Sequence, residues 1–494
     1  MKNNLIQNST LPFIPATEVL QKLNLTSPYC LFESSEIEEH SGRLSLLALD
    51  PAIEFIGKGQ ECTVNLLDER RKEAFNVLAK NFKDQIVEQS TTSLKLAFKT
   101  IPFHDSEEKR FEIPCAAQVL RFFLKSFYSK EESYTGLYGA LGYNFVYPFE
   151  EIKTQKEAET ADFHLYYFDT ILVFNHLMMD LNLVALRASE KELLAVKENI
   201  SKALKSDINT PKEAFEIGEL SIEPSDEAFK NQILEAKELF AQGEVMELVL
   251  SRKITASVNG DSMRLYEKYK LVNPSPYMFY FQFGSSQLFG ASPEIMVKVE
   301  KGKVYLKPIS GTAPRGKNAI EDHERQMELL NSDKEKSELD MLIDLGRNDL
   351  ARICKPGVSI DHYRSVEKYS HVFHTVARLS GDLEEGKMGV DALIACLNAG
   401  TLTGTPKNAA MQHIENMEQH SRGYYGGCVG YLLMNGEVNT AITIRSAHIK
   451  NNTLSYLSGA TLLYECDPDF ELTETKIKAA AFQQALKDFQ YEKV

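Results

Sequence analysis

The sequence predicts an α+β fold, and two observations lead to this prediction. In the N-terminal part, short apolar runs such as Leu44–Leu49 and Thr170–Asn175 are broken by Gly, Asn and Pro, as is typical of strands and turns. Further along, a run that gives way near Gly243 has apolar residues at helical spacing, namely Phe229, Ile233, Ala236 and Phe240. Strands and helices therefore both contribute to the expected core.

The C-terminal half predicts three successive strands followed by a helix. The three runs are Cys428–Met434, Val438–Ala447 and Thr453–Leu463. Asn435-Gly436 is expected to form a type I′ turn and Asn451-Asn452 the next turn, so the runs are expected to form a meander. Thr405-Pro406 is interpreted as the N-cap and first turn of a helix over 406–418, and a last helix is expected over 470–488.

The chain divides into two regions joined by a connector. Residues 206–225 are polar, contain Pro211 and Pro224, and end at a Ser225-Asp226 helix cap. We therefore expect an N-terminal region over 10–205 and a C-terminal region over 226–488.

Composition and charge exclude several classes of protein. With 494 residues, 43% hydrophobic and 25% charged, the chain can bury a substantial core. A net charge of −15 without any basic run argues against a nucleic-acid partner. The N-terminus lacks a secretory h-region and no run of about 18 apolar residues occurs, so we expect a cytoplasmic protein with no membrane partner. Seven cysteines without CxxC spacing indicate reduced, mostly buried thiols.

Two pairs of charged residues could lie on helix faces. Glu474 and Lys478 are four residues apart on the last helix, and Glu335 and Glu338 are three apart on another charged stretch. Solvated ion pairs are the simpler interpretation. If Glu338 and Glu474 converged, they would supply the few carboxylate ligands that Mg²⁺ prefers. Spacing alone cannot show that convergence.

The predicted C-terminal strands also carry candidate binding groups. Alternation within Thr440–Ser446 places Arg445 on the face opposite Ile442 and Ile444, where it would bind either an exposed carboxylate or a substrate carboxylate. Small residues at Gly459-Ala460-Thr461 would let backbone N–H groups approach an anion, although tight strand packing explains the glycine equally well.

Three other features carry little functional weight by themselves. Either His371 or His374 could be an ordinary structural residue. Gly400 to Lys407 has the wrong spacing for a phosphate-binding loop, and the Gly-rich run around Cys428 opens a strand, so Cys428 is not expected to be a nucleophile.

The ordered set of motifs resembles the chorismate-utilising enzymes, and within them anthranilate synthase component I. The resemblance covers residues 10–60 and 225–485. It rests on Asn273–Met278, Gly290–Glu294, Pro308–Thr312, Asp344–Asp349, Thr401–Lys407, Tyr425–Gly427, Ile444–Ser446 and Glu474–Ala479. It implies a large composite fold of antiparallel sheets with surrounding helices.

The resemblance also implies a role for each matching residue. Glu338 and Glu474 would bind Mg²⁺, Glu294 would protonate the departing ring hydroxyl, His374 would serve in pyruvate elimination, and Thr401 would belong to the catalytic set. Chorismate would be bound by Gly311, Thr312, Tyr425, Arg445, Gly459, Ala460, Thr461 and Lys478. Tryptophan would inhibit from a separate pocket formed by Ser34, Pro276, Tyr277 and Met278. A glutamine amidotransferase subunit would supply ammonia, since none of the seven cysteines has a credible glutaminase context.

Three positions depart from many anthranilate synthases, which have Gln, Ala and Gly where this chain has Glu247, Ser310 and Thr461. Isochorismate synthases carry a lysine at Glu247, and aminodeoxychorismate synthases carry one at Ser310, so both rival chemistries lose their distinctive residue. Two alternatives to anthranilate formation stay open. One is a synthase that stops at aminodeoxyisochorismate and retains pyruvate. The other is a non-catalytic amino-acid-binding regulator, which the presence of Glu338, Glu474 and His374 disfavours.

Overall fold

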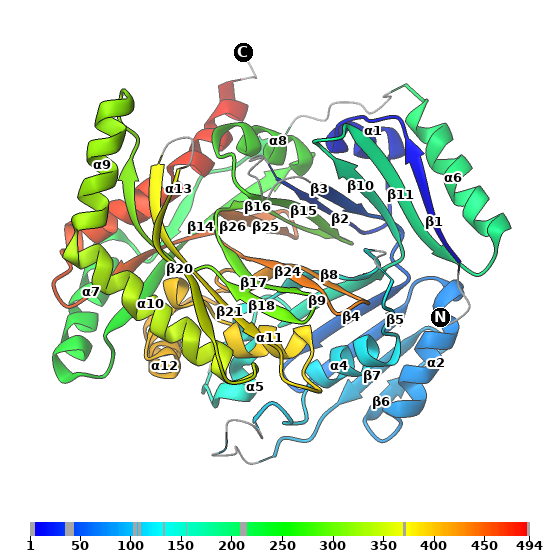
Figure 1. Cartoon of the computed structure of the whole chain (residues 1–494), viewed down its shortest axis with the longest axis horizontal. Helices are drawn as coiled ribbons and strands as arrows, with labels where there is room; N and C mark the ends of the chain where they lie inside the picture. The colour runs from blue at the N-terminus through cyan, green and yellow to red at the C-terminus, as the bar shows by residue number, and fades with distance from the viewer. Residues whose placement is uncertain are drawn as a thin grey trace.

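Two large antiparallel sheets lie face to face with helices on their outer faces, as the computed structural model shows (Figure 1). The structure describes residues 5–34, 44–101, 106, 110–131, 134–154, 156–207, 215–368 and 372–491. Among these residues, none of the helices combines the length and apolar character needed to cross a membrane. The predicted α+β fold of antiparallel sheets with surrounding helices is confirmed.

The first sheet joins strands from both ends of the sequence. Its order is β1 (Leu5–Leu11), β11 (Asp180–Arg187), β10 (Thr170–Asn175), β3 (Leu44–Ala48), β2 (Tyr29–Glu33), β15 (Tyr277–Phe283), β16 (Ser286–Ser292), β25 (Ser446–Lys450), β26 (Thr453–Leu462), β14 (Glu247–Asn259) and β12 (Glu216–Ile217). Two short strands, β13 (Ser221–Glu223) and β22 (Gly404–Thr405), also pair with β14.

The second sheet mixes the two regions in the same way. Its order is β19 (Ile309–Pro314), β21 (Val372–Asp382), β18 (Lys303–Leu306), β17 (Ile295–Glu300), β24 (Val438–Ile442), β23 (Cys428–Leu433), β8 (Gly136–Leu141), β9 (Phe163–Phe168), β4 (Ile53–Lys58), β5 (Glu61–Leu66), β7 (Ser93–Ala97) and β6 (Ile86–Gln89), with β20 (Ser359–Lys368) paired to β21. The two predicted regions therefore share both sheets, and the division at 206–225 stays a prediction about the sequence.

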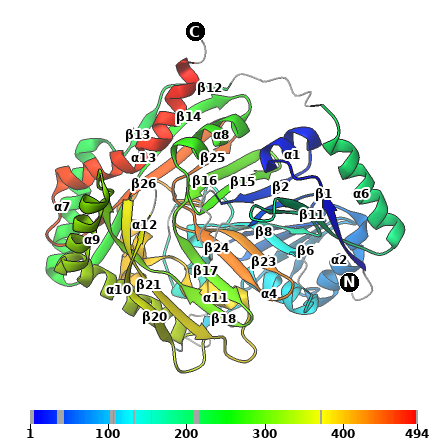
Figure 2. The same cartoon turned by 45° about the horizontal axis from the view of Figure 1, so that its top comes forward.

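Helices cover the outer faces of the sheets (Figures 1 and 2). Beside the first sheet lie α1 (Ala16–Leu23), α6 (Glu190–Leu204), α8 (Ser262–Val272) and α13 (Pro468–Tyr491). The others are α2 (Lys72–Asn81), α4 (Ala117–Ser126), α5 (Tyr147–Glu150), α7 (Asp226–Gln242), α9 (Ala319–Asn331), α10 (Asp333–Ala351), α11 (Gly389–Cys396) and α12 (Lys407–Met417).

Strand β15 shows how alternation builds the layers. Phe279, Phe281 and Phe283 point into the core between the two sheets, while Met278 and Tyr280 point to the outer face under the helices. Across the inter-sheet core, the Phe283 ring stacks on Tyr166 of β9 with ring centroids 6.0 Å apart. Each such buried aromatic side chain contributes about 1.5–3 kcal/mol of hydrophobic free energy, which holds the sheets together.

Several local predictions are confirmed by the structure. Helix α7 begins after Ser225, whose side chain accepts a hydrogen bond from the Ala228 N–H, and ends at Gly243 with φ 75°. Asn451 and Asn452 have φ values of 50° and 57°, as a type I′ turn requires. The type I′ turn predicted at Asn435-Gly436 is wrong, because only Gly436 has a positive φ there, 88°. All seven cysteines are free and buried.

The predicted C-terminal meander is wrong in one respect. The run Val438–Ala447 is not one strand: β24 ends at Ile442 in the second sheet, and β25 begins at Ser446 in the first. The chain crosses between the sheets at 443–445, so Arg445 lies in this crossing, with φ 50°, and not on a strand face. Thr405 is likewise not a helix cap, because it pairs with Glu247 as part of β22.

Candidate functional site

Helix α10 brings two carboxylates to the end of β19. The Ser332 side chain caps this helix by accepting a hydrogen bond from the Glu335 N–H. Burial raises the pKa of Glu338, and the charge of Glu335 raises it further, while the Ser310 hydroxyl offsets part of the rise. A Cβ added to Gly311 would lie 2.7 Å from Glu335 Oε2, and Gly311 has φ 65°. Glycine is therefore required where β19 approaches the acidic helix.

Helix α13 contributes a second acidic group and a lysine. Lys478 Nζ lies 3.0 Å from Glu474 Oε1 and donates to the Gly459 carbonyl of β26, also at 3.0 Å. Burial alone would raise the pKa of Glu474, but Lys478 beside it lowers that pKa overall. Burial, together with the nearby Glu474, raises the pKa of Glu471 to about 8. The charge of Glu474 raises the pKa of Glu338, so the two predicted metal ligands, on α13 and α10, lie near enough for their charges to interact. Metal binding by them stays a prediction.

Glu294 is a partly buried acid near two cations. Its Oε2 accepts a hydrogen bond from Thr401 Oγ1 at 3.0 Å. Burial raises the pKa of Glu294, while Thr401, Lys478 and Arg445 reduce the rise. A carboxyl group of this kind holds its proton to higher pH than usual, as a general acid needs.

His374 lies on β21 opposite Thr312 of β19. Its Nδ1 is 3.0 Å from Thr312 Oγ1 and 3.2 Å from the Gly311 carbonyl oxygen. Burial lowers the pKa of His374, although the Gly311 carbonyl opposes this shift. The positive charge of Arg445 also lowers this pKa, so the imidazole is neutral near pH 7. His371 lies outside the described residues.

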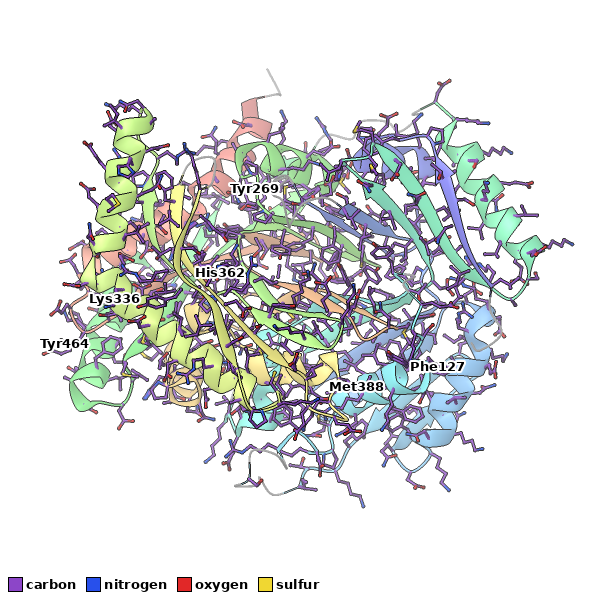
Figure 3. All side chains as sticks on the ribbon, viewed as in Figure 1. Phe127, Tyr269, Lys336, His362, Met388 and Tyr464 are labelled. Atoms are coloured by element: carbon purple, nitrogen blue, oxygen red, sulfur yellow. The ribbon has the colours of Figure 1, made fainter. Side chains whose placement is uncertain are left out.

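The backbone of Arg445, in the segment that crosses between the sheets, is held by two hydrogen bonds. The Arg445 carbonyl accepts a hydrogen bond from the hydroxyl of Tyr269, which α8 places in the interior at 1% exposure (Figure 3). The same carbonyl accepts from the Ala291 N–H at 3.1 Å. Both contacts hold the crossing against α8 and β16.

The Gly459–Thr461 backbone lies on β26, paired in register with residues 249–251 of β14. A Cβ on Gly459 would lie 2.7 Å from the Tyr425 hydroxyl, so the glycine permits close contact between the strand and this tyrosine. Of the predicted chorismate-binding residues, Tyr425 and Lys478 therefore both lie against Gly459. Their individual roles stay predictions.

Glu247 is the buried acid that departs from the family pattern. It is 1% exposed, and its Oε2 has no hydrogen-bond partner among the residues that the structure describes. Burial, and then the charge of Glu338, raise its pKa to about 8. A cavity of about 730 Å³ is lined by the neighbouring Met246 and by Met341 of α10, but not by Glu247 itself.

The acidic groups fit a cation, although they do not form a complete metal cage. Among the described residues, no group of three or more His, Cys, Asp or Glu side chains could hold a metal ion. The Oε2 atoms of Glu471 and Glu247 are nevertheless buried without a partner, and three neighbouring glutamates have raised pKa values. Buried carboxyl groups that resist ionisation without a nearby cation suit a Mg²⁺ ion whose coordination is completed by water and substrate.

The predicted inhibitor residues meet at the edge of β2 and β15. Glu33 pairs with Met278, so Ser34 follows at the position beside Tyr277. Met278 is 1% exposed and packs in the outer core of the first sheet, whereas Tyr277 packs against the inter-sheet core. This proximity is what an inhibitor pocket would need, and tryptophan binding there stays a prediction.

Two sets of residues near the site were not predicted from the sequence. Glu471 lies three residues before Glu474 on the same helix face, and that spacing was the available signal. Glu418 and Arg422 form a buried ion pair beneath Tyr425, which the pattern around them did not reveal.

The fold and the site together define a chorismate binding enzyme. The model of the family described as chorismate binding enzyme matches residues 64–484, and the chain therefore belongs to this family. The chain is similar to anthranilate synthase component 1 of Vibrio cholerae, with 34% identity over 475 residues that cover 92% of this chain and 91% of the relative. It is 36% identical over 408 residues to anthranilate synthase component 1 of Neisseria gonorrhoeae, covering 78% and 79%.

Solved structures agree with this assignment. Anthranilate synthase component I from Streptococcus pneumoniae superposes with a TM-score of 0.68 at 26% identity, covering 91% of this chain and 94% of that one. The menaquinone-specific isochorismate synthase from Escherichia coli gives a TM-score of 0.69 at 16% identity, covering 98% and 94%, and shows the common fold alone. The resemblance drawn from the motifs is confirmed.

Proposed function

We propose that the chain is the chorismate-converting component of an anthranilate synthase, a cytoplasmic lyase that forms anthranilate and pyruvate in tryptophan biosynthesis. One observation carries the proposal. Glu294, with its raised pKa, lies near both Lys478 and Arg445, and His374, with its lowered pKa, lies near Arg445. Glu474 pairs with Lys478 and lies near enough to Glu338 for the two carboxylates to interact. This arrangement combines an acid, a base, a cation site and carboxylate-binding groups.

The first step is addition of ammonia with loss of the ring hydroxyl. Ammonia forms a bond to one ring carbon while the double-bond electrons shift and the C–O bond of the hydroxyl breaks. Glu294 donates its proton to that oxygen, which leaves as water. Arg445 and Lys478 hold the substrate carboxylates, so the ring is oriented before reaction.

The second step is elimination of the enolpyruvyl group. Neutral His374 accepts the ring proton, the C–O bond of the enol ether breaks, and pyruvate leaves after its methylene carbon gains a proton. The ring becomes aromatic as anthranilate. A Mg²⁺ ion held by Glu338 and Glu474 would neutralise a substrate carboxylate and so strengthen binding in both steps.

The test uses the purified chain with chorismate, Mg²⁺ and an ammonium salt, followed by anthranilate fluorescence and mass spectrometry. We expect anthranilate and pyruvate in equal amounts, and no product from Glu294→Gln. Glu300→Gln, at the far end of β17, the strand that begins directly after Glu294, is the matched control and should retain turnover. Accumulation of aminodeoxyisochorismate would instead identify the synthase that retains pyruvate, and no turnover would refute the proposal.

Glutamine should replace ammonia only when a separate amidotransferase subunit is added. The buried, free state of all seven cysteines supports this part of the proposal. If the isolated chain consumed glutamine at the rate of anthranilate formation, the partner would be unnecessary and this part would be wrong.

A further inference from the structure

Glu418 and Arg422 form an ion pair that is almost completely buried beside the candidate site. Their side chains are 1% and 3% exposed, and Arg422 donates to both carboxylate oxygens, at 2.8 Å from Nε and 2.6 Å from Nη2. Burial alone would raise the pKa of Glu418, but Arg422 holds it at about 2. The pair is therefore charged at neutral pH.

The other hydrogen bonds of this ion pair are made mainly with the backbone of segments that carry predicted site residues or lie opposite them. Arg422 Nη1 donates to the Leu402 carbonyl at 2.6 Å, directly after Thr401, and Nη2 donates to the Val249 carbonyl at 2.7 Å. Glu418 Oε1 accepts from the N–H and the hydroxyl of Ser251, at 2.7 and 2.8 Å.

These backbone contacts fall opposite predicted substrate-binding positions. In the β14–β26 ladder, Val249 pairs with Thr461 and Ser251 pairs with Gly459. The ion pair therefore fixes β14 at the two positions that support the Gly459–Thr461 backbone.

The same arginine also contacts the segment that carries Tyr425. The Arg422 carbonyl accepts from the Tyr425 N–H at 3.0 Å, and its guanidinium lies 5.7 Å from the Tyr425 ring centroid and 4.7 Å from that of Tyr143. The Tyr143 hydroxyl in turn lies 3.2 Å from Thr403 Oγ1. Three segments far apart in sequence are thus tied to one side chain.

We propose that the Glu418–Arg422 pair is a positioning element for the reaction, holding Thr401, Tyr425 and the Gly459–Thr461 backbone in their relative orientation without touching substrate. A buried ion pair adds little net stability compared with packed apolar residues, so stability alone does not account for it. The planar guanidinium fork, in contrast, fixes the direction of each hydrogen bond. The inference rests on the proposed function, because the positioned residues are those assigned to chorismate and to Glu294.

Arg422→Lys tests the proposal because it keeps the charge and loses the fork. Misplacement of catalytic groups by about 1 Å costs on the order of 100-fold in rate, so we expect kcat to fall by about 10- to 100-fold in the folded variant. Loss of the Thr401 hydrogen bond would raise the pKa of Glu294 further. The basic limb of the pH profile of kcat should therefore move to higher pH, in the same direction as for Thr401→Val.

The matched control is Arg187→Lys. Arg187 is a buried arginine on β11 of the first sheet, and it donates hydrogen bonds to Asp169 and to the Leu186 carbonyl. The control variant should lose stability without moving the pH profile. In a double-mutant cycle, Arg422→Lys and Thr401→Val should be strongly non-additive in kcat. If Arg422→Lys kept the kcat and pH profile of the original chain, or if the two changes were additive, the proposal would be overturned.

Two further arms keep the test decisive. If Arg422→Lys does not fold, Ser251→Ala removes one hydrogen bond to Glu418, leaves both charges, and should move the pH profile in the same direction by less. Hydrogen exchange of peptides covering 246–252 and 399–405 needs no substrate, and the proposal expects it to be faster in the variant. A chain that turns over no chorismate refutes the proposed function, whereas unchanged exchange refutes the positioning role.

Discussion

Replacing Glu247 with Gln is expected to stabilise the folded chain at neutral pH, although it removes a polar group from the candidate site. The carboxyl group is 1% exposed, and burial together with the charge of Glu338 raises its pKa from 4.5 to about 8. A carboxyl group with a raised pKa binds its proton more tightly in the folded state than in the unfolded state. Its protonation therefore stabilises the fold fully below pH 4.5, and this stabilisation is lost as pH rises to 8.

The size of the effect follows from that interval. Between pH 4.5 and pH 8 the unfolded chain has released the proton and the folded chain retains it. At ~1.36 kcal/mol per pH unit, the loss of stability reaches at most about 5 kcal/mol. Glutamine has nearly the same shape and does not titrate, so the variant avoids the loss.

Urea unfolding between pH 4.5 and 8.5, with EDTA present to remove cations, measures this difference. The free energies of unfolding of the two proteins should be similar near pH 4.5, and the original chain should become progressively less stable than the variant toward pH 8. Glu198→Gln, on an exposed position of α6, is the control and should give a parallel curve. A constant difference between the original chain and Glu247→Gln over this range would refute the reasoning.

Three further outcomes are expected. Glu474→Gln should change the free energy of unfolding by less than ~1 kcal/mol, because its side chain is 33% exposed and its ion pair is partly solvated, yet it should abolish chorismate turnover. Near-normal turnover at limiting Mg²⁺ would remove Glu474 from the metal site. Arg445→Lys should raise the KM for chorismate, since lysine cannot form a bidentate carboxylate contact, and an unchanged KM would place Arg445 outside the site. In calorimetry, tryptophan should bind the chain, and it should weaken chorismate binding by the same factor by which chorismate weakens tryptophan binding. Ser34→Phe should abolish the heat of tryptophan binding. If the original chain gave no heat of tryptophan binding, the pocket would be ruled out.

Local structure was predictable where one short segment contains all the interactions that determine it. Ser225 and Gly243 end α7 through contacts within a single turn, and Asn451-Asn452 adopt the turn that their side chains favour. The run Thr170–Asn175 matches β10 residue for residue. None of these outcomes depends on a distant part of the chain.

The error over Val438–Ala447 has a tertiary cause. Apolar and polar residues alternate across the whole run, but the alternation does not specify which sheet accepts each strand. The pairing of β24 with β23 ends at Ile442, which lies opposite Cys428. The pairing of β25 with β16 begins at Ser446, which lies opposite Gly290 in the other sheet. A left-handed arginine at the crossing is disfavoured locally and persists because the contacts on both sides fix it.

The candidate site was identified from ordered motifs, whereas its geometry required the fold. Spacing could not relate Glu338 to Glu474, since they lie on two helices, α10 and α13, that are far apart in the sequence. It also could not show that Glu247 faces Glu338, or that Arg422 contacts β14, because both relations join segments far apart in the sequence.

The mixing of the two sequence regions in both sheets has a consequence for biosynthesis. β2 pairs with β15, and β8 pairs with β23, so the strands of the first two hundred residues acquire their final neighbours only when much later segments have been made. Until then β8, whose residues are all buried in the complete protein, presents an open apolar edge to the cell. Contacts of such long range fold slowly, so the growing polypeptide depends on the completion of translation, and a fragment truncated in the middle retains strands prone to self-association.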